Sequence, residues 1–173
     1  MTSSVYVEGN LQFTFSGYVT VEKFDDNQKN PYGMKSVDFV AEDTEKLYFL
    51  EVKDYQHPLA TQEQIDKGLT MLQDACMNKS FFCVEMGQKV KDSLLRKYAL
   101  GDVINKDVVF LLLINFDILG KAERALLKSR ISGFIPTGLN ESRFLAFTSI
   151  SFELVNAEKL EEFGITCTAI AEV

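Results

Sequence analysis

The chain of 173 residues contains no tryptophan, a single histidine, and three residues each of cysteine and proline. With one histidine and no Gly-x-Ser-x-Gly sequence, we do not expect a serine- or cysteine-hydrolase triad. The cysteine count is odd, and Cys76 and Cys83 are not spaced like zinc ligands, which argues against a disulfide framework and a structural zinc site. No Walker loop or dinucleotide fingerprint is present either.

Long apolar runs are also missing. The longest, Val108 to Ile114, is far too short to span a bilayer. The N-terminus has no basic segment followed by an apolar stretch, so we expect no secretory signal, no membrane partner and a cytoplasmic protein. Because no repeat or flexible linker interrupts the chain, we predict a single domain over residues 1–173.

Basic residues are in the minority, with 18 against 25 acidic ones and a formal net charge of −7. This balance argues against binding of nucleic acid through a broadly basic surface. The acidic excess is concentrated in residues 1–57, which carry ten acidic and five basic side chains. Such a segment either repels polyanions or holds a cation that reverses the local charge.

Two β-hairpins are predicted near the N-terminus. The first joins Val5–Val7 to Leu11–Phe15, and the second joins Ser36–Glu42 to Leu47–Asp54. Residues 17–26 between them fit a short helix by spacing and a strand by composition, so both interpretations stay open.

Two helices should follow the second hairpin. Thr61 and Gln64 make a capping box that opens the first, and the second is predicted over Phe81–Ala99. The second helix has an apolar face with four residues at steps of four, and it also has a polar face. The apolar face contains Phe82, Met86, Val90 and Leu94, and the polar face contains Lys89, Ser93, Arg96 and Lys97.

The remainder predicts alternating strands and helices. The apolar run over Asp107–Phe116 is typical of a strand buried on both faces, and Asp117 is the expected N-cap of the next helix. A strand over Phe144–Val155, a short helix over Ala157–Phe163 and a last strand over Ile165–Ile170 complete the chain. This order predicts an α/β or α+β fold with a mixed central sheet flanked by helices.

Three charged residues of the second hairpin are expected to converge. With a tight turn at Thr44-Glu45, Asp38 lies directly opposite Glu51, and Lys53 shares their face because strand side chains alternate. Two ionised carboxylates about 4–5 Å apart repel each other by on the order of 3–4 kcal/mol at an effective dielectric near 20. A raised pKa, the ammonium of Lys53 or a divalent cation would offset this repulsion. Mg²⁺ is the natural cation because it prefers carboxylate oxygens.

A cross-strand ion pair at the end of a strand would explain the same three residues. The wider pattern, however, resembles the PD-(D/E)xK nuclease superfamily: Val37-Asp38, twelve intervening residues, then Glu51-Val52-Lys53, on a hairpin followed by helices and a buried strand. Val37 stands where that pattern often has proline.

The resemblance implies a restriction-endonuclease-like core and a nuclease that depends on Mg²⁺ or Mn²⁺ and hydrolyses DNA with a metal-activated water. It assigns Asp38 and Glu51 as metal ligands, with the backbone carbonyl of Val52 as a third, and Lys53 as the catalytic lysine. The partner would be DNA or another nucleic acid, bound weakly without the metal, together with a second copy of the chain or a protein partner. The alternative is a catalytically inactive nuclease-fold module for binding or assembly.

The resemblance also implies supporting residues outside the hairpin. An additional acid would be Glu22 or Asp25, whereas Asp26 is assigned to a solvated turn. Gln88 and Lys89 are the candidate phosphate contacts on the helix after the motif. A second basic stretch would serve the same purpose, and both sets are also explained by a solvated helix face. That stretch contains Lys121, Arg124, Lys128 and Arg130.

Overall fold

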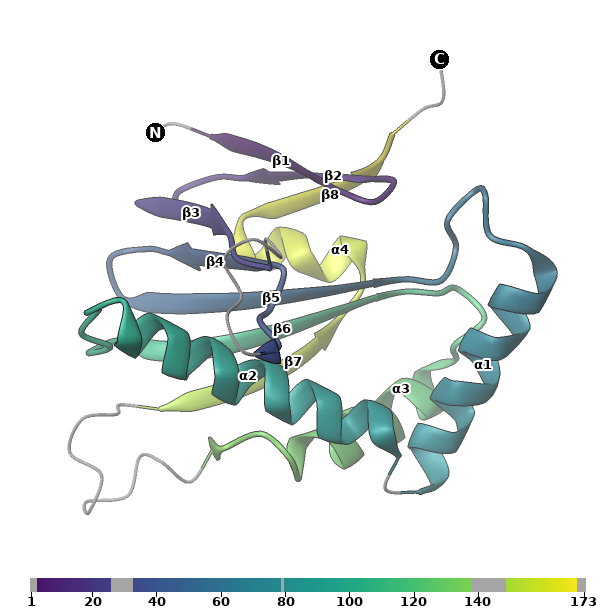
Figure 1. The fold of residues 1–173 in the computed structure, drawn as a ribbon. Coiled ribbons are helices and arrows are strands. Elements are labelled where there is room, and N and C mark those ends of the chain that lie inside the picture. The colour runs from purple at the N-terminus through teal and green to yellow at the C-terminus, as the bar shows by residue number, and fades with distance from the viewer. Residues whose placement is uncertain (1–2, 26–32, 79, 138–148, 171–173) are drawn as a thin grey trace.

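The structure is a computed structural model that describes residues 3–25, 33–78, 80–137 and 149–170 (Figure 1). Over these ranges the chain forms an α+β fold with eight strands in two sheets and four α-helices. The predicted combination of helices with a mixed sheet is therefore confirmed. None of the described helices combines the length and the apolar character needed to cross a membrane.

The larger sheet has the strand order β3-β4-β5-β6-β7. Its strands are β3 (Thr20–Lys23), β4 (Phe39–Glu42), β5 (Lys46–Asp54), β6 (Asp107–Asn115) and β7 (Ile150–Val155). The first three are antiparallel, whereas β5, β6 and β7 run parallel, so the sheet is mixed. The central strand β6 is buried on both faces, as its unbroken apolar run predicts.

A smaller antiparallel sheet lies over one face of the larger one, and the sequence did not predict it as a separate sheet. It contains β1 (Ser4–Glu8), β2 (Leu11–Phe15) and β8 (Ile165–Ala169) in the order β1-β2-β8. Between the two sheets, Phe13 and Phe15 pack against Phe39 at ring-centroid distances of 5.4 and 5.6 Å. These fully buried rings hold the first hairpin, and with it Glu8, over the start of β4.

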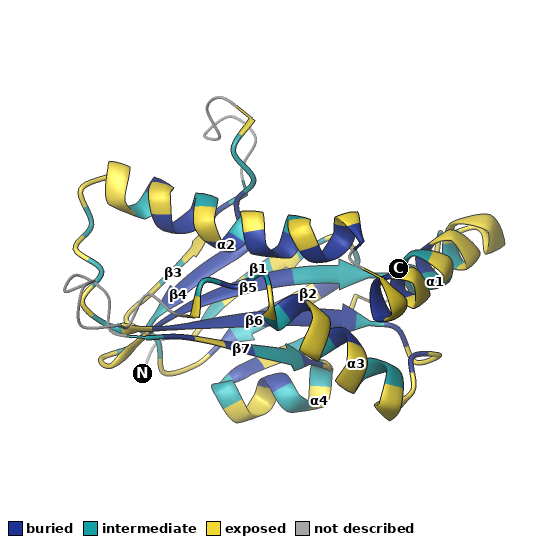
Figure 2. Cartoon of the chain, turned by 90° about the horizontal axis from the view of Figure 1, so that it is seen from below, coloured by how far each residue is buried: buried dark blue, intermediate teal, exposed yellow. Residues whose placement is uncertain are grey.

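The opposite face of the larger sheet is covered by three helices, and their buried side chains share one core with β5 and β6 (Figures 1 and 2). They are α1 (Gln62–Met77), α2 (Phe81–Ala99) and α3 (Lys121–Ser132). A short α4 (Ala157–Leu160), followed by the 3-10 turn Glu161–Phe163, belongs to the core between the sheets. The predicted bounds of α2 and its buried apolar row are confirmed.

One of the two predicted helix N-caps is confirmed and the other is wrong. The capping box at Thr61 is present, with Gln64 accepting a hydrogen bond from the Thr61 N–H. The prediction that Asp117 caps α3 is wrong, because the N-cap is Gly120. A turn that buries Phe116 and Leu119 follows β6 and delays the helix by about one turn.

The ambiguous residues 17–26 contain strand β3, which pairs with β4 at the edge of the larger sheet. The helical interpretation of this segment is therefore wrong, because Thr20–Lys23 pair with β4 as a strand. Asp26 and the first part of the predicted strand over Phe144–Val155 lie outside the described residues.

The polar face of α2 packs inward, contrary to the usual position of such a face. Ser93 is fully buried and Arg96 is 6% exposed. The Ser93 hydroxyl accepts a hydrogen bond from the Val37 N–H at 3.0 Å. The Arg96 guanidinium donates to the Phe24 carbonyl and lies 4.0 Å from the centroid of the Phe24 ring. These side chains fix the backbone segments on both sides of the site described below.

Replacing Arg96 with methionine should destabilise the fold by about 2–4 kcal/mol. The variant leaves the buried Phe24 carbonyl without its charged donor, and hydrogen bonds of this kind contribute more than neutral ones. Urea unfolding measures the change. The matched control is Lys91→Met on the exposed side of α2, which should stay within about 0.5 kcal/mol of the parent. Equal stabilities of the two variants would contradict the structural role of Arg96.

Candidate functional site

The β4–β5 hairpin has the predicted register, with Phe39 paired to Leu50. Asp38 lies one residue before the first ladder pair, at the point where β4 begins and β5 continues. Its Oδ2 accepts a hydrogen bond from the Val52 N–H at 2.5 Å. The side chain of Asp38 thus takes the place of a main-chain acceptor and is held beside β5.

Glu51 and Lys53 lie on one face of β5, and the distance from Lys53 Nζ to Glu51 Oε1 is 2.8 Å. Glu51 is fully buried, whereas the Lys53 side chain is 25% exposed. The structure therefore brings Asp38, Glu51 and Lys53 together at one end of the hairpin. Val52 contributes its N–H to Asp38, and its side chain packs toward the smaller sheet.

Lys89 of α2 completes this group. Its ammonium contacts the carboxylates of the hairpin directly, whereas the prediction had it on the surface in contact with a phosphate. Its Nζ lies 2.7 Å from each carboxylate oxygen of Glu51 and 3.8 Å from Oδ1 of Asp38. Two acidic and two basic side chains then form what we call the charge-balanced cluster: Asp38, Glu51, Lys53 and Lys89. Their formal charges cancel when all four are ionised.

Burial dominates the electrostatics of the cluster. It raises the pKa of Asp38 to about 8, with a further contribution from the neighbouring Glu51, while Lys89 and the Val52 N–H oppose the rise. Burial alone would lower the pKa of Lys53. The attraction of Glu51 and the hydrogen bond to it outweigh this effect and raise the pKa above its ordinary value. Lys53 is therefore firmly cationic.

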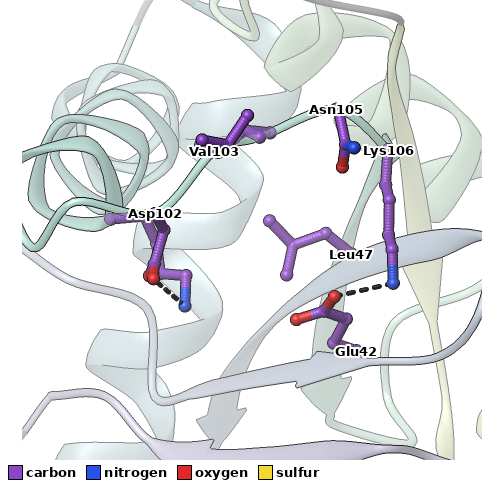
Figure 3. A pocket seen from close by; sticks show the side chains of 8 residues that line it. Glu42, Leu47, Asp102, Val103, Asn105 and Lys106 are labelled. Atoms are coloured by element: carbon purple, nitrogen blue, oxygen red, sulfur yellow. Dashed lines mark hydrogen bonds and ion pairs between the residues drawn. The ribbon is translucent and has the colours of Figure 1, made fainter.

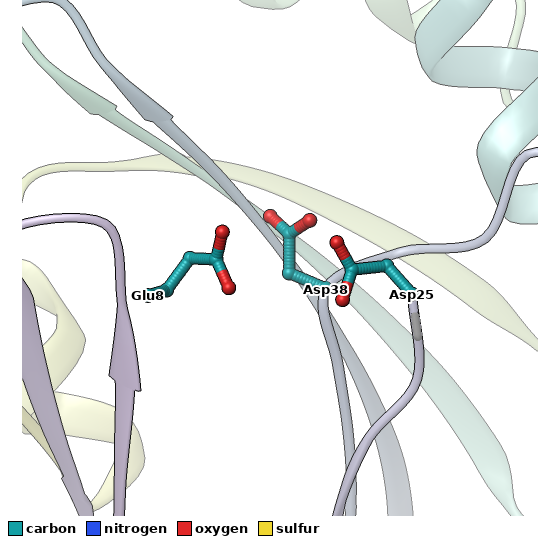
Figure 4. Close-up of side chains that lie close together, drawn as sticks. All are labelled: Glu8, Asp25 and Asp38. Carbon is teal, nitrogen blue, oxygen red and sulfur yellow. The ribbon is translucent and has the colours of Figure 1, made fainter. Parts of the chain in front are cut away.

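A second group of carboxylates adjoins the first and shares Asp38 with it. Oxygen atoms of Glu8, Asp25 and Asp38 lie within 4.8 Å of one another (Figure 4). Burial, followed by the charge of Glu8, raises the pKa of Asp25. Asp25 thus occupies the neighbourhood expected of the additional acid, whereas Glu22 is exposed on the edge strand β3 and is not part of this group.

Sequence reasoning missed Glu8 and the position of Lys89. Glu8 ends the first strand of the smaller sheet, and no local pattern indicates that this strand lies over the start of β4. Lys89 had a signal in the sequence, because it follows Phe82 by seven residues, or two helical turns, and so shares the side of the helix that carries the apolar row.

The donor set fits a hard divalent cation. The metal-ligating side chains of this region, Glu8, Asp25, Asp38 and Glu51, all offer carboxylate oxygens, which Mg²⁺ and Mn²⁺ prefer over softer metals. Asp38, Glu51 and the Val52 carbonyl form one candidate ligand set, and Glu8, Asp25 and Asp38 form another. The two sets have Asp38 in common.

The remaining predicted phosphate contacts have other neighbours. Gln88 is exposed and donates to Asp92 at 3.5 Å. In α3, Arg124 donates to the carbonyl of Phe116, and Lys128 pairs with Glu153 at 2.8 Å. Arg130 donates to the carbonyl of Cys76. These three basic side chains of α3 therefore hold the helix to its surroundings.

Two cavities lie near the ends of the hairpin. One of about 450 Å³ follows Lys53 along the chain and is lined by Asp54, Tyr55, His57, Leu59, Ala60 and Gln64. The other, of about 190 Å³, lies at the far end, where the pairs Glu42–Lys106 and Lys97–Asp102 neutralise its charges (Figure 3). The lining of the first cavity begins with Asp54, the residue after Lys53, and contains none of the four residues of the charge-balanced cluster.

Comparison of the chain with models of protein families, with curated proteins and with solved structures found no match. The function is therefore argued from the site itself.

Replacing Asp38 with asparagine should change how stability depends on pH. The pKa of Asp38 is raised to about 8 in the folded protein, so the folded parent binds the carboxyl proton more tightly than the unfolded chain does. This proton contributes its full stabilisation below about pH 4, and the stabilisation is lost as the pH rises toward 8. Asparagine does not titrate, so the variant does not lose stability in this way. Its free energy of unfolding relative to the parent should therefore rise between pH 5 and 8, by at most about 1.4 kcal/mol per pH unit.

Urea unfolding at several pH values measures this difference. The matched control is Asp66→Asn on the exposed side of α1, where the difference from the parent should stay nearly constant. A constant difference for Asp38→Asn as well would show that Asp38 titrates normally.

Proposed function

We propose that the protein is a Mg²⁺- or Mn²⁺-dependent DNA nuclease with a restriction-endonuclease-like core. The observation that carries the proposal is the convergence of Asp38, Glu51 and Lys53 at the end of the β4–β5 hairpin, in the register expected from the motif. The order of elements supports it: the hairpin is followed by two helices and then by β6, parallel to β5.

On this proposal each residue has a distinct role. Asp38 and Glu51, with the Val52 carbonyl, would hold the cation. Asp25 and Glu8 would add further carboxylate oxygens next to Asp38. When bound, the cation would neutralise a phosphate oxygen and lower the pKa of water. Lys53, firmly cationic and partly exposed, would stabilise the charge that develops on the phosphate as water attacks in line.

The overall charge shapes the expected binding. At −7 the protein repels DNA on average, so affinity should be weak unless cations act at the site. The cavity that begins at Asp54, the residue after Lys53, would provide room for a nucleotide near the cleaved bond.

A specific observation favours the alternative, a catalytically inactive nuclease-fold module. The charge-balanced cluster neutralises its own carboxylates with two lysines, and Glu51 is fully buried. Titration with Mg²⁺ or Mn²⁺ separates the two functions. The absence of both a heat of binding and a thermal shift would support the module.

Cleavage assays test the nuclease directly. Purified protein with Mg²⁺ or Mn²⁺ should cut DNA when single-stranded, duplex and branched substrates are offered. Asp38→Ala and Lys53→Ala should each lower the rate at least about 100-fold, because the first removes a ligand of the cation and the second removes the positive charge beside the phosphate. Lys67→Ala, an exposed lysine on α1, is the control and should cut like the parent.

Circular dichroism of each variant verifies folding. Cutting that survives both substitutions in folded protein would place the chemistry elsewhere, and cutting that persists after chelation would contradict the metal dependence.

A further inference from the structure

Lys89 occupies the space in which a cation would contact both acidic residues of the hairpin. Its ammonium engages both oxygens of Glu51 at 2.7 Å and approaches Asp38 at 3.8 Å. The Lys89 side chain is only 13% exposed, so this contact lies inside the molecule. A Mg²⁺ ion needs ligand oxygens at about 2.0–2.1 Å and near-octahedral geometry, which Glu51 cannot supply while both its oxygens are engaged.

The lysine has an alternative position within reach. Glu85 lies one turn earlier on the same helix, at the i−4 spacing that favours a Glu–Lys pair; its Oε1 already accepts a hydrogen bond from Lys35 Nζ at 2.9 Å, so Lys89 would share this carboxylate with Lys35. The long, flexible stem of lysine allows its ammonium to change partners without movement of the helix backbone. Glu51, by contrast, is fixed in a central strand.

We propose that Lys89 is a built-in competitor of the divalent cation: its ammonium and the cation occupy the Asp38–Glu51 pair in turn. This inference rests on the proposed function. Without the cation, Lys89 stabilises the two buried carboxylates. When a divalent cation takes the pair, the ammonium of Lys89 is released from Glu51 and becomes available to a phosphate. The positive charge needed for the substrate therefore appears only after the carboxylates are occupied.

Calorimetric titration of Mg²⁺ into metal-free protein, without nucleic acid, tests the competition. Lys89→Gln keeps a polar side chain of similar length but removes the charge, so the Asp38–Glu51 pair loses its competitor and the variant should bind Mg²⁺ at least about tenfold more tightly. Lys91→Gln, exposed on the same helix, should bind like the parent.

A second measurement uses the parent protein and does not depend on folding of a variant. Labelling with an amine-reactive reagent, read by mass spectrometry, should modify Lys89 slowly without Mg²⁺ and several-fold faster with it, whereas Lys91 should react equally in both conditions.

The outcomes distinguish the two proposals. Equal or weaker Mg²⁺ binding by Lys89→Gln, or an unchanged labelling rate of Lys89 while Mg²⁺ binds, would overturn the competition and leave the nuclease proposal intact. No Mg²⁺ binding by either protein would overturn both.

Discussion

The burial of two carboxylates side by side is the constraint on which the rest of this structure depends. Asp38 and Glu51 are 6% and 0% exposed, and unpaired charges at such positions are very costly. The fold answers with two lysines from different elements, Lys53 on the same strand and Lys89 on α2. The packing of α2 on the larger sheet therefore also determines how the carboxylates of the hairpin are neutralised.

The same helix face also sets the geometry of the site. Ser93 and Arg96 follow Lys89 by one and two turns, and they bind the backbone at Val37 and Phe24, the residues that lead to Asp38 and Asp25. A displacement of α2 would therefore move both acids together. The polar row of α2 positions the site from within the core, in addition to supplying one of its charges.

Local patterns predicted much of this arrangement, and long-range pairing explains most of what they missed. The hairpin register follows from a short turn and strict alternation, and the start of α1 follows from its capping box. The smaller sheet could not be predicted from local patterns, because β2 near the N-terminus pairs with β8 near the C-terminus. The inward position of Lys89 and Ser93 was missed because their polar type suggested a solvated face. By spacing they follow Phe82 and Met86 by two helical turns and so share the side of the apolar row.

Under the proposed function, the charge balance of the cluster would allow an acidic protein to act on a polyanion. While Lys53 and Lys89 are both paired with Glu51, neither offers its full charge to a phosphate. A cation that occupies the carboxylates would release positive charge at the place where a negative ligand must bind. Under the proposed function, repulsion by the net charge of −7 would oppose binding of nucleic acid to the protein without the cation. The electrostatic field at the site would favour a phosphate only once the cation is bound.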